Sequence, residues 1–164
     1  MLAMLFALAI TLSWLESLLS LPTPVPGVKL GLSNTVTMYC VFFLGPLPAL
    51  ALATLKGLFA AITRGMTAGI MSAIGGVVSV GAMLLAQRFK ASIGMTSVCG
   101  AISHNMAQLM VCAIMLRSKF ALWYLPVLVI SGIIMGLVTG AAARLLLPAL
   151  KKLGLNNKNS YSDR

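Results

Sequence analysis

The sequence predicts an all-α, polytopic membrane protein of about six transmembrane helices in a compact bundle. Hydrophobic residues make up 60% of the 164 residues and charged residues only 9%, and the mean hydropathy is +1.03. A water-soluble domain of this length carries many more charges on its surface. Several apolar stretches also reach the roughly 20 residues that cross a hydrocarbon core. Because no alternating strand pattern is present, the segments that satisfy their own backbone groups in lipid are expected to be helices.

The first half of the chain predicts three helices. The first covers about residues 1–19 and ends before the Pro-rich segment 21–27, where prolines remove backbone donors. No small-residue cleavage site precedes this segment, so we expect a helix of the mature protein and not a signal peptide. The second helix covers about residues 30–44, and the third follows almost directly and extends to Ile62. The Gly-Pro-Leu-Pro sequence at 45–48 connects them as a tight hairpin.

The second half predicts three further helices. They cover about residues 67–86, 95–116 and 122–147, and short basic segments separate them. We therefore expect residues 1–150 to form a single six-helix transmembrane domain. Residues 151–164 are expected to form a short basic cytoplasmic tail.

The positions of the basic residues predict how the chain lies in the plasma membrane. With six spans both termini share a side, and cytoplasmic termini place seven Lys and Arg residues inside against four outside, as the positive-inside rule favours. The inside set is Arg88, Lys90, Arg144, Lys151, Lys152, Lys158 and Arg164, and the outside set is Lys29, Arg64, Arg117 and Lys119. The net charge of +10 is spread singly at the ends of apolar runs, so the expected partner is the lipid bilayer and not nucleic acid.

Small residues recur at every fourth position on several predicted helices. Lipid is as apolar as leucine, so membrane helices associate through close backbone approach, which small side chains permit. Packing within the bundle is therefore the expected role of these stripes. The first helix has the same spacing at Ala3 and Ala7, and this pair could instead face another protein. The longer stripes are Ala49, Ala53, Gly57 and Ala61; Ala68, Ser72 and Gly76; and Gly132, Gly136 and Gly140.

Polar side chains within apolar segments are costly in lipid and are candidates for a functional site. The predicted topology places most of them toward the outer half of the bundle, where the set is mostly basic. Such a recess suits a small anionic or amphipathic ligand with a carboxylate, phosphate or diphosphate group. Three other roles stay open: Lys56 could extend to the interface, Glu16 could pair with it, and the amides could bridge helices. The candidate ligand-binding residues are Lys29, Asn34, Lys56, His104, Asn105 and Gln108.

Cofactor, metal and nucleotide chemistry are not expected. His104 is the single histidine, which excludes a metal site built from several imidazoles. The chain has no Gly-rich loop with the spacing of a nucleotide-hydrolysing site, so any energy from ATP would come from a partner. No catalytic residue and no cofactor are predicted.

Three segments resemble a known membrane family. They are Pro26–Asn34, Gly75–Ser79 and Gly100–Leu109, and together they look like heptaprenyl diphosphate synthase component I, also called the Gx transporter family. That family is similar to the substrate-binding S components of energy-coupling factor transporters. The resemblance implies six helices, a ligand site beneath the first loop, and a docking motif for a coupling subunit with ATPases at Ala3 and Ala7.

The enzyme name in this resemblance does not imply catalysis by this chain. Elongation of prenyl diphosphates needs clustered aspartates that hold magnesium and the diphosphate, and the sequence has a single aspartate, Asp163. Two functions therefore stay open. The first is a substrate-binding subunit of a transporter for a small anionic or amphipathic ligand. The alternative is a non-catalytic accessory component of isoprenoid or quinone metabolism, paired with a soluble prenyltransferase.

Overall fold

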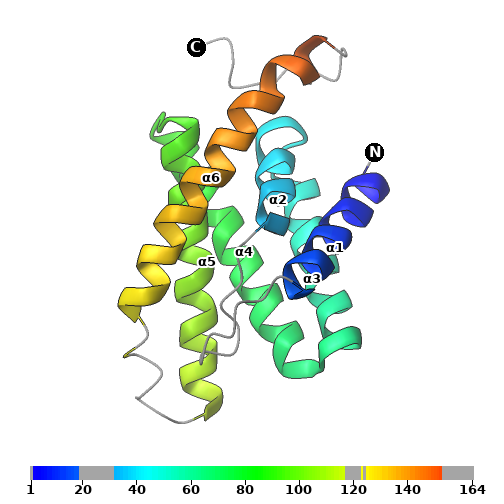
Figure 1. Ribbon diagram of the computed structural model, residues 1–164, viewed down its shortest axis with the longest axis vertical. Helices are drawn as coiled ribbons and strands as arrows, with labels where there is room; N and C mark the ends of the chain where they lie inside the picture. The colour runs from blue at the N-terminus through cyan, green and yellow to red at the C-terminus, as the bar shows by residue number, and fades with distance from the viewer. Residues whose placement is uncertain (1, 19–31, 117–122, 124, 153–164) are drawn as a thin grey trace.

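Every element that the computed structural model describes is an α-helix. The described residues are 2–18, 32–116, 123 and 125–152, and within them the chain runs up and down as an antiparallel bundle (Figure 1). The all-α prediction is confirmed for this part of the chain. The six helices are α1 Leu2–Leu18, α2 Leu32–Phe43, α3 Pro46–Arg64, α4 Met66–Arg88, α5 Ile93–Leu116 and α6 Leu125–Lys152.

Four of these helices, α3 to α6, are long and apolar enough to cross a membrane. The other two are shorter, since α1 has 17 residues and α2 has 12. Their lengths correspond to rises of about 26 Å and about 18 Å, less than the roughly 30 Å of a typical hydrocarbon core. The structure therefore supports a membrane protein with four clear candidate spans, and six spans stay a prediction.

Helix α2 lies in the centre of the bundle. It packs against α1, α3 and α6, and its consecutive residues 40–43 are all buried. Met38 is 1% exposed and Cys40 is fully buried. The apolar character that predicted a membrane span here thus also serves packing against protein on every side.

Helices α3 and α4 form a hairpin whose interface is made of small residues. A single residue, Gly65, connects them at φ 94°, a left-handed conformation that glycine adopts without a steric penalty. A Cβ atom added to Gly57 would lie 2.6 Å from the Cβ of Ala73, and one added to Gly76 would lie 2.9 Å from that of Ala53. The predicted stripe on the third helix is therefore confirmed as a packing surface.

The stripe predicted on the fourth helix needs a correction. Gly69, Ala73 and Gly76 face α3, whereas the predicted Ala68 and Ser72 line a cavity inside the bundle. Only Gly76 was assigned to the right face. The error is a rotation of one residue around the helix, which a four-residue spacing does not resolve because a turn has 3.6 residues.

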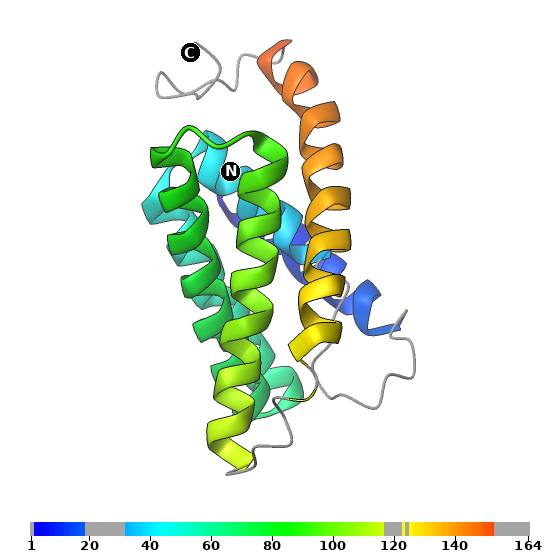
Figure 2. The ribbon, with the colours of Figure 1, turned by 90° about the vertical axis from the view of Figure 1, so that its left-hand side faces the viewer.

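The interface between α5 and α6 follows the predicted glycine stripe. Cβ atoms added to Gly136 and Gly140 would approach Val98 at 2.5 Å and Gly94 at 3.1 Å. Between α4 and α5, the buried Ser79 Oγ donates a 2.8 Å hydrogen bond to the Gly100 carbonyl. The four long helices therefore form a continuous series of close antiparallel contacts (Figure 2).

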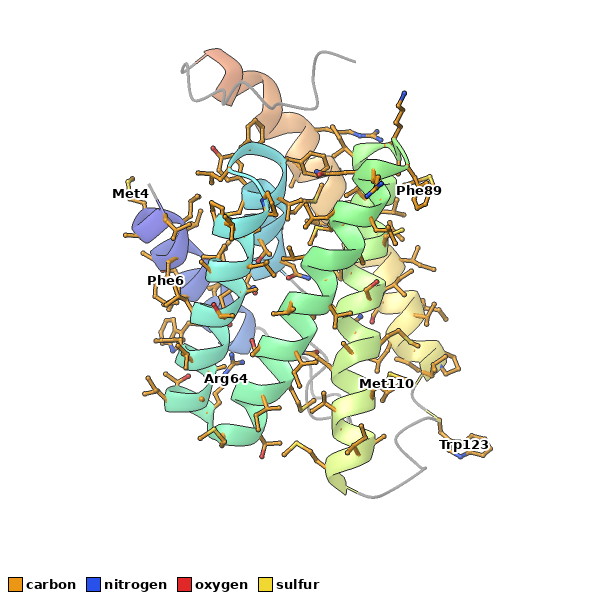
Figure 3. The ribbon with its side chains drawn as sticks, turned by 180° about the vertical axis from the view of Figure 1, so that it is seen from behind. Met4, Phe6, Arg64, Phe89, Met110 and Trp123 are labelled. Carbon is orange, nitrogen blue, oxygen red and sulfur yellow. The ribbon has the colours of Figure 1, made fainter. Side chains whose placement is uncertain are left out.

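The ends of the helices alternate between the two ends of the bundle. Arg64 lies toward one end and Phe89 toward the other (Figure 3). The start of α1 and the end of α6 both lie toward the Phe89 end (Figure 1). Helix α6 continues through Lys152, so it passes the predicted domain boundary at residue 150. The rest of the predicted tail, 153–164, lies outside the described residues.

Candidate functional site

A cavity of about 270 Å³ lies inside the bundle, and side chains from all six helices line it. Small-molecule sites in proteins are mostly apolar recesses with a few polar groups at defined positions. This cavity combines both kinds of group, because methionine, phenylalanine and alanine side chains line it together with polar side chains from every helix. It is therefore the candidate site.

Lys56 and Arg64 are the two basic side chains of the cavity wall within the described residues. Lys56 is partly buried, and its Nζ donates to the Ser33 carbonyl at 3.2 Å and to Thr37 Oγ1 at 3.4 Å. Arg64 is exposed at the end of α3, and its Nη2 donates to Ser13 Oγ at 3.4 Å. The cationic groups thus stand at two depths, separated by about 12 Å of helix rise.

Helix α5 presents one polar face to the cavity. His104 and Gln108 pack against Gly75, where an added Cβ would lie 3.0 Å from both side chains. His104 Nδ1 is buried and has no hydrogen-bond partner among the residues that the structure describes. The Asn34 Oδ1 atom on α2 is in the same situation. Asn34 Oδ1 could accept a hydrogen bond from a ligand or a water molecule, and His104 Nδ1 could accept or donate one according to its tautomer.

Asn105 connects helices as well as lining the cavity. Its Nδ2 donates to the Leu128 carbonyl at 3.0 Å and to Ser131 Oγ at 3.4 Å, both on α6. One of the open alternatives, an amide that bridges helices, therefore holds for Asn105. Asn105 also lines the cavity wall, where it can contact a ligand.

The opposite end of the cavity is uncharged in the described part of the chain. Met83 and Met135 line it, together with Ser97 and Thr139. Ser97 is 3% exposed, and its Oγ has no partner among the described side chains and backbone groups. Methionine is flexible and polarisable, so these walls can adapt to an apolar chain.

The structure brings together five of the six predicted ligand-binding residues. Asn34, Lys56, His104, Asn105 and Gln108 all line the same cavity, while Lys29 and the Pro-rich segment lie outside the described residues. Among the residues that the sequence reasoning missed are Ser97 and Ala101 on α5. Together with His104 and Gln108 they follow spacings of four, three and four residues, so extending that helical face would have found them.

The predicted docking pair lies away from the cavity. Ala3 and Ala7 are exposed on α1, beside Met4 and Leu8. Ile10 and Ser13 are the α1 residues that line the cavity. The side chain of Glu16 is not described, so the alternative that it pairs with Lys56 stays open.

A comparison with protein families identifies the chain. The family model of heptaprenyl diphosphate synthase component I matches residues 5–146, which is most of the chain. Neither the curated proteins nor the solved structures contain a match. The resemblance inferred from the sequence is confirmed, and the chain belongs to this family.

Proposed function

We propose that this member of the heptaprenyl diphosphate synthase component I family is a non-catalytic membrane component that binds an isoprenoid diphosphate. It would act with a separate, soluble prenyltransferase subunit. The family description supports this proposal because it denotes one component of a synthase. The observation that carries it is the cavity, where Lys56 and Arg64 enter a mainly apolar wall.

The charge balance of the chain favours an anionic ligand in this cavity. The sequence has 12 Lys and Arg residues against two acidic residues, Glu16 and Asp163. The chain therefore has a large excess of positive charge. Hydrogen bonds from Lys or Arg to a phosphate are about twice as strong as neutral ones, and an environment poor in water strengthens them.

The same count supports a partner subunit for the chemistry. Prenyl transfer uses magnesium ions that several carboxylates hold beside the diphosphate. Two acidic side chains in the whole sequence are too few for such a cluster. Catalysis is therefore assigned to another chain, and this one supplies binding within the membrane.

Ligand titration of the protein in lipid nanodiscs tests the binding role. Farnesyl diphosphate is the probe, and farnesol, which lacks the charged head, is the matched control ligand. We expect Lys56→Gln to weaken the binding of farnesyl diphosphate by about tenfold or more, because one charge-assisted hydrogen bond is lost. Arg88→Gln should bind normally, since Arg88 is exposed outside the cavity. Equal binding by wild type and Lys56→Gln would contradict the proposal.

Reconstitution with a soluble prenyltransferase tests the accessory role. The activity or the product length of that enzyme should change when the chain is added, and Lys56→Gln should reduce this change. An enzyme that behaves identically with and without the chain would rule out the accessory role while leaving ligand binding intact.

A second candidate is a substrate-binding subunit of a transporter that works with a coupling subunit and ATPases. What favours it is the exposure of Ala3 and Ala7 on α1, since small residues at this spacing allow another membrane helix to approach. The test is copurification with such a coupling subunit. An Ala3→Leu and Ala7→Leu double variant should lose the partner and keep ligand binding. Copurification of the double variant with an unchanged yield of partner would exclude docking through this face.

A further inference from the structure

We infer that the cavity is polarised along the bundle axis and binds one short prenyl chain in a defined direction. The diphosphate lies between Lys56 and Arg64, and the hydrocarbon extends toward Thr139. This inference rests on the proposed function and adds to it the orientation and the chain length of the ligand.

The contacts between helices show where the charged part of the cavity ends. Gly57 faces Ala73 on α4, and Gly75 faces His104 on α5. Lys56 and His104 therefore lie at nearly the same level in the bundle. Arg64 lies about 12 Å farther toward one end. Both cations of the described cavity wall are thus in the half that ends at Arg64.

The other half of the cavity extends in the opposite direction from His104. On α5 it reaches Ser97, seven residues away, which corresponds to about 10 Å of helix rise. Met83 and Met135 line it, and they are 2% exposed and partly buried, respectively. At its end Ser97 lies against α6, with its Cβ 3.4 Å from a Cβ built on Gly140, the neighbour of Thr139. Apart from the Ser97 and Thr139 hydroxyls at its far end, this half offers apolar contacts that suit hydrocarbon.

The cavity is long compared with its volume. Its α4 residues extend from Thr67 to Met83, which corresponds to about 24 Å of helix rise. A volume of about 270 Å³ over that length fits one extended chain better than a compact or ring-shaped molecule. The elongated shape of the cavity and the position of both cations in one half thus favour a linear amphiphile with a single charged end.

The volume also limits the length of the chain. A water molecule needs roughly 10–15 Å³ of a volume measured in this way, so the cavity of about 270 Å³ holds roughly 20 water-sized groups. Geranyl diphosphate, with its head group included, is close to this size, whereas heptaprenyl diphosphate is about twice as large. The ligand that fits inside is therefore a short-chain precursor, and a long-chain product would leave most of its hydrocarbon outside the cavity.

A chain-length series in nanodiscs tests this inference. Inorganic diphosphate, geranyl diphosphate and heptaprenyl diphosphate are titrated against wild type, Lys56→Gln and Met135→Trp. We expect affinity to rise by about tenfold or more from inorganic to geranyl diphosphate as apolar surface is buried, and to rise no further for heptaprenyl diphosphate. Met135→Trp fills the apolar half and should remove the gain for geranyl diphosphate while leaving inorganic diphosphate unchanged.

The outcomes separate this inference from the proposed function. Equal affinity for inorganic and geranyl diphosphate, with weaker binding of both by Lys56→Gln, would overturn the chain site and retain the anion site. A steady rise up to heptaprenyl diphosphate would overturn the length limit. Indifference of every probe to Lys56→Gln would overturn the proposed function itself.

Two further variants test the same inference without the large Met135→Trp substitution. Ala101→Leu narrows the same half of the cavity from α5 and should repeat the effect of Met135→Trp if that variant does not fold. Ser97→Ala removes the buried hydroxyl at the far end and should leave geranyl diphosphate binding unchanged or tighter. A loss of tenfold or more in Ser97→Ala would show that this end holds a polar group, and the proposed direction would be wrong.

Discussion

The interface between α3 and α4 and the exposed face of α1 have the same sequence pattern in different surroundings. On α3, Ala53 and Gly57 lie against backbone and Cβ atoms of α4. On α1, Ala3 and Ala7 are exposed and no described helix covers them. Small residues at four-residue spacing therefore indicate that close approach is possible at a surface. They do not indicate which surface approaches, or whether it belongs to the same chain.

The largest effect in this comparison is expected for Gly57→Leu. A Cβ at this position would lie 2.6 Å from the Ala73 Cβ and 2.9 Å from its Cα, so the two helices must separate. We expect a loss of about 3 kcal/mol in the free energy of unfolding, at the upper end of overpacking effects, and a marked fall in thermal stability in detergent. Gly81→Leu is the control, because nothing lies within 4 Å of its added Cβ. Similar melting temperatures for the two variants would show that the interface is not tightly packed.

A smaller loss is expected for Ser79→Ala on the next interface. Ser79 is fully buried, and its Oγ donates to the Gly100 carbonyl on α5 at 2.8 Å. Interhelical hydrogen bonds in membrane proteins contribute about 0.6 kcal/mol on average, and we expect a loss of about that size. Thr54→Ala removes exposed hydrogen bonds to carbonyls of its own helix and should be closer to neutral. The same unfolding assay compares the two variants, and an equal or larger loss in Thr54→Ala would contradict this ranking.

A local change at the cavity is expected for Gly75→Ala. The added methyl would lie 3.0 Å from His104 and Gln108, so these side chains must move by a few tenths of an ångström. Alanine is a better helix former than glycine, and this gain opposes the packing cost. We therefore expect stability within about 1 kcal/mol of wild type and a measurable change in farnesyl diphosphate affinity. Unchanged affinity would indicate that this face of α5 does not contact the ligand.

The smallest effect on stability is expected for Ala7→Leu on the exposed face of α1. Surface substitutions are usually within about 0.5 kcal/mol of wild type. Ala9→Leu is a close comparison, since Ala9 is fully buried two residues away and should lose about 1–3 kcal/mol through overpacking. Unfolding of both variants in detergent measures the difference. A destabilised Ala7→Leu would mean that this face already packs within the protein.

Most of the helical content was predictable because it depends on local sequence. The Gly-Pro-Leu-Pro segment and the basic turn after α4 separated helices that the structure confirms. The two shorter helices were harder, since an apolar run predicts burial without distinguishing lipid from protein. The central position of α2 and the rotation of the α4 stripe toward Gly69 and Ala73 could not be predicted, because both depend on neighbours distant in the sequence.

Some residues of the candidate site could likewise be identified from the sequence and others could not. Lys56, His104 and Gln108 could be identified because a polar side chain in an apolar segment is conspicuous in the sequence. Met38, Met83 and Met135 could not, because methionine in a membrane helix is an ordinary residue until a cavity gives it a neighbour. The family match over residues 5–146 confirmed the resemblance of three sequence segments, which had already put a soluble prenyltransferase among the possible partners.

The sequence by itself determined the class of molecule, the helices and the excess of positive charge, since hydropathy and charge are sums over local residues. It also excluded a cluster of acidic residues of the kind that prenyl transfer requires. Only the tertiary structure decided which small-residue stripes meet and which one stays exposed. It also placed polar residues from α2, α3 and α5 around one cavity, with both cations in one half and Met83 and Met135 in the other. The physical reason is that a cavity exists only between helices, so its shape and polarity depend on how distant segments pack.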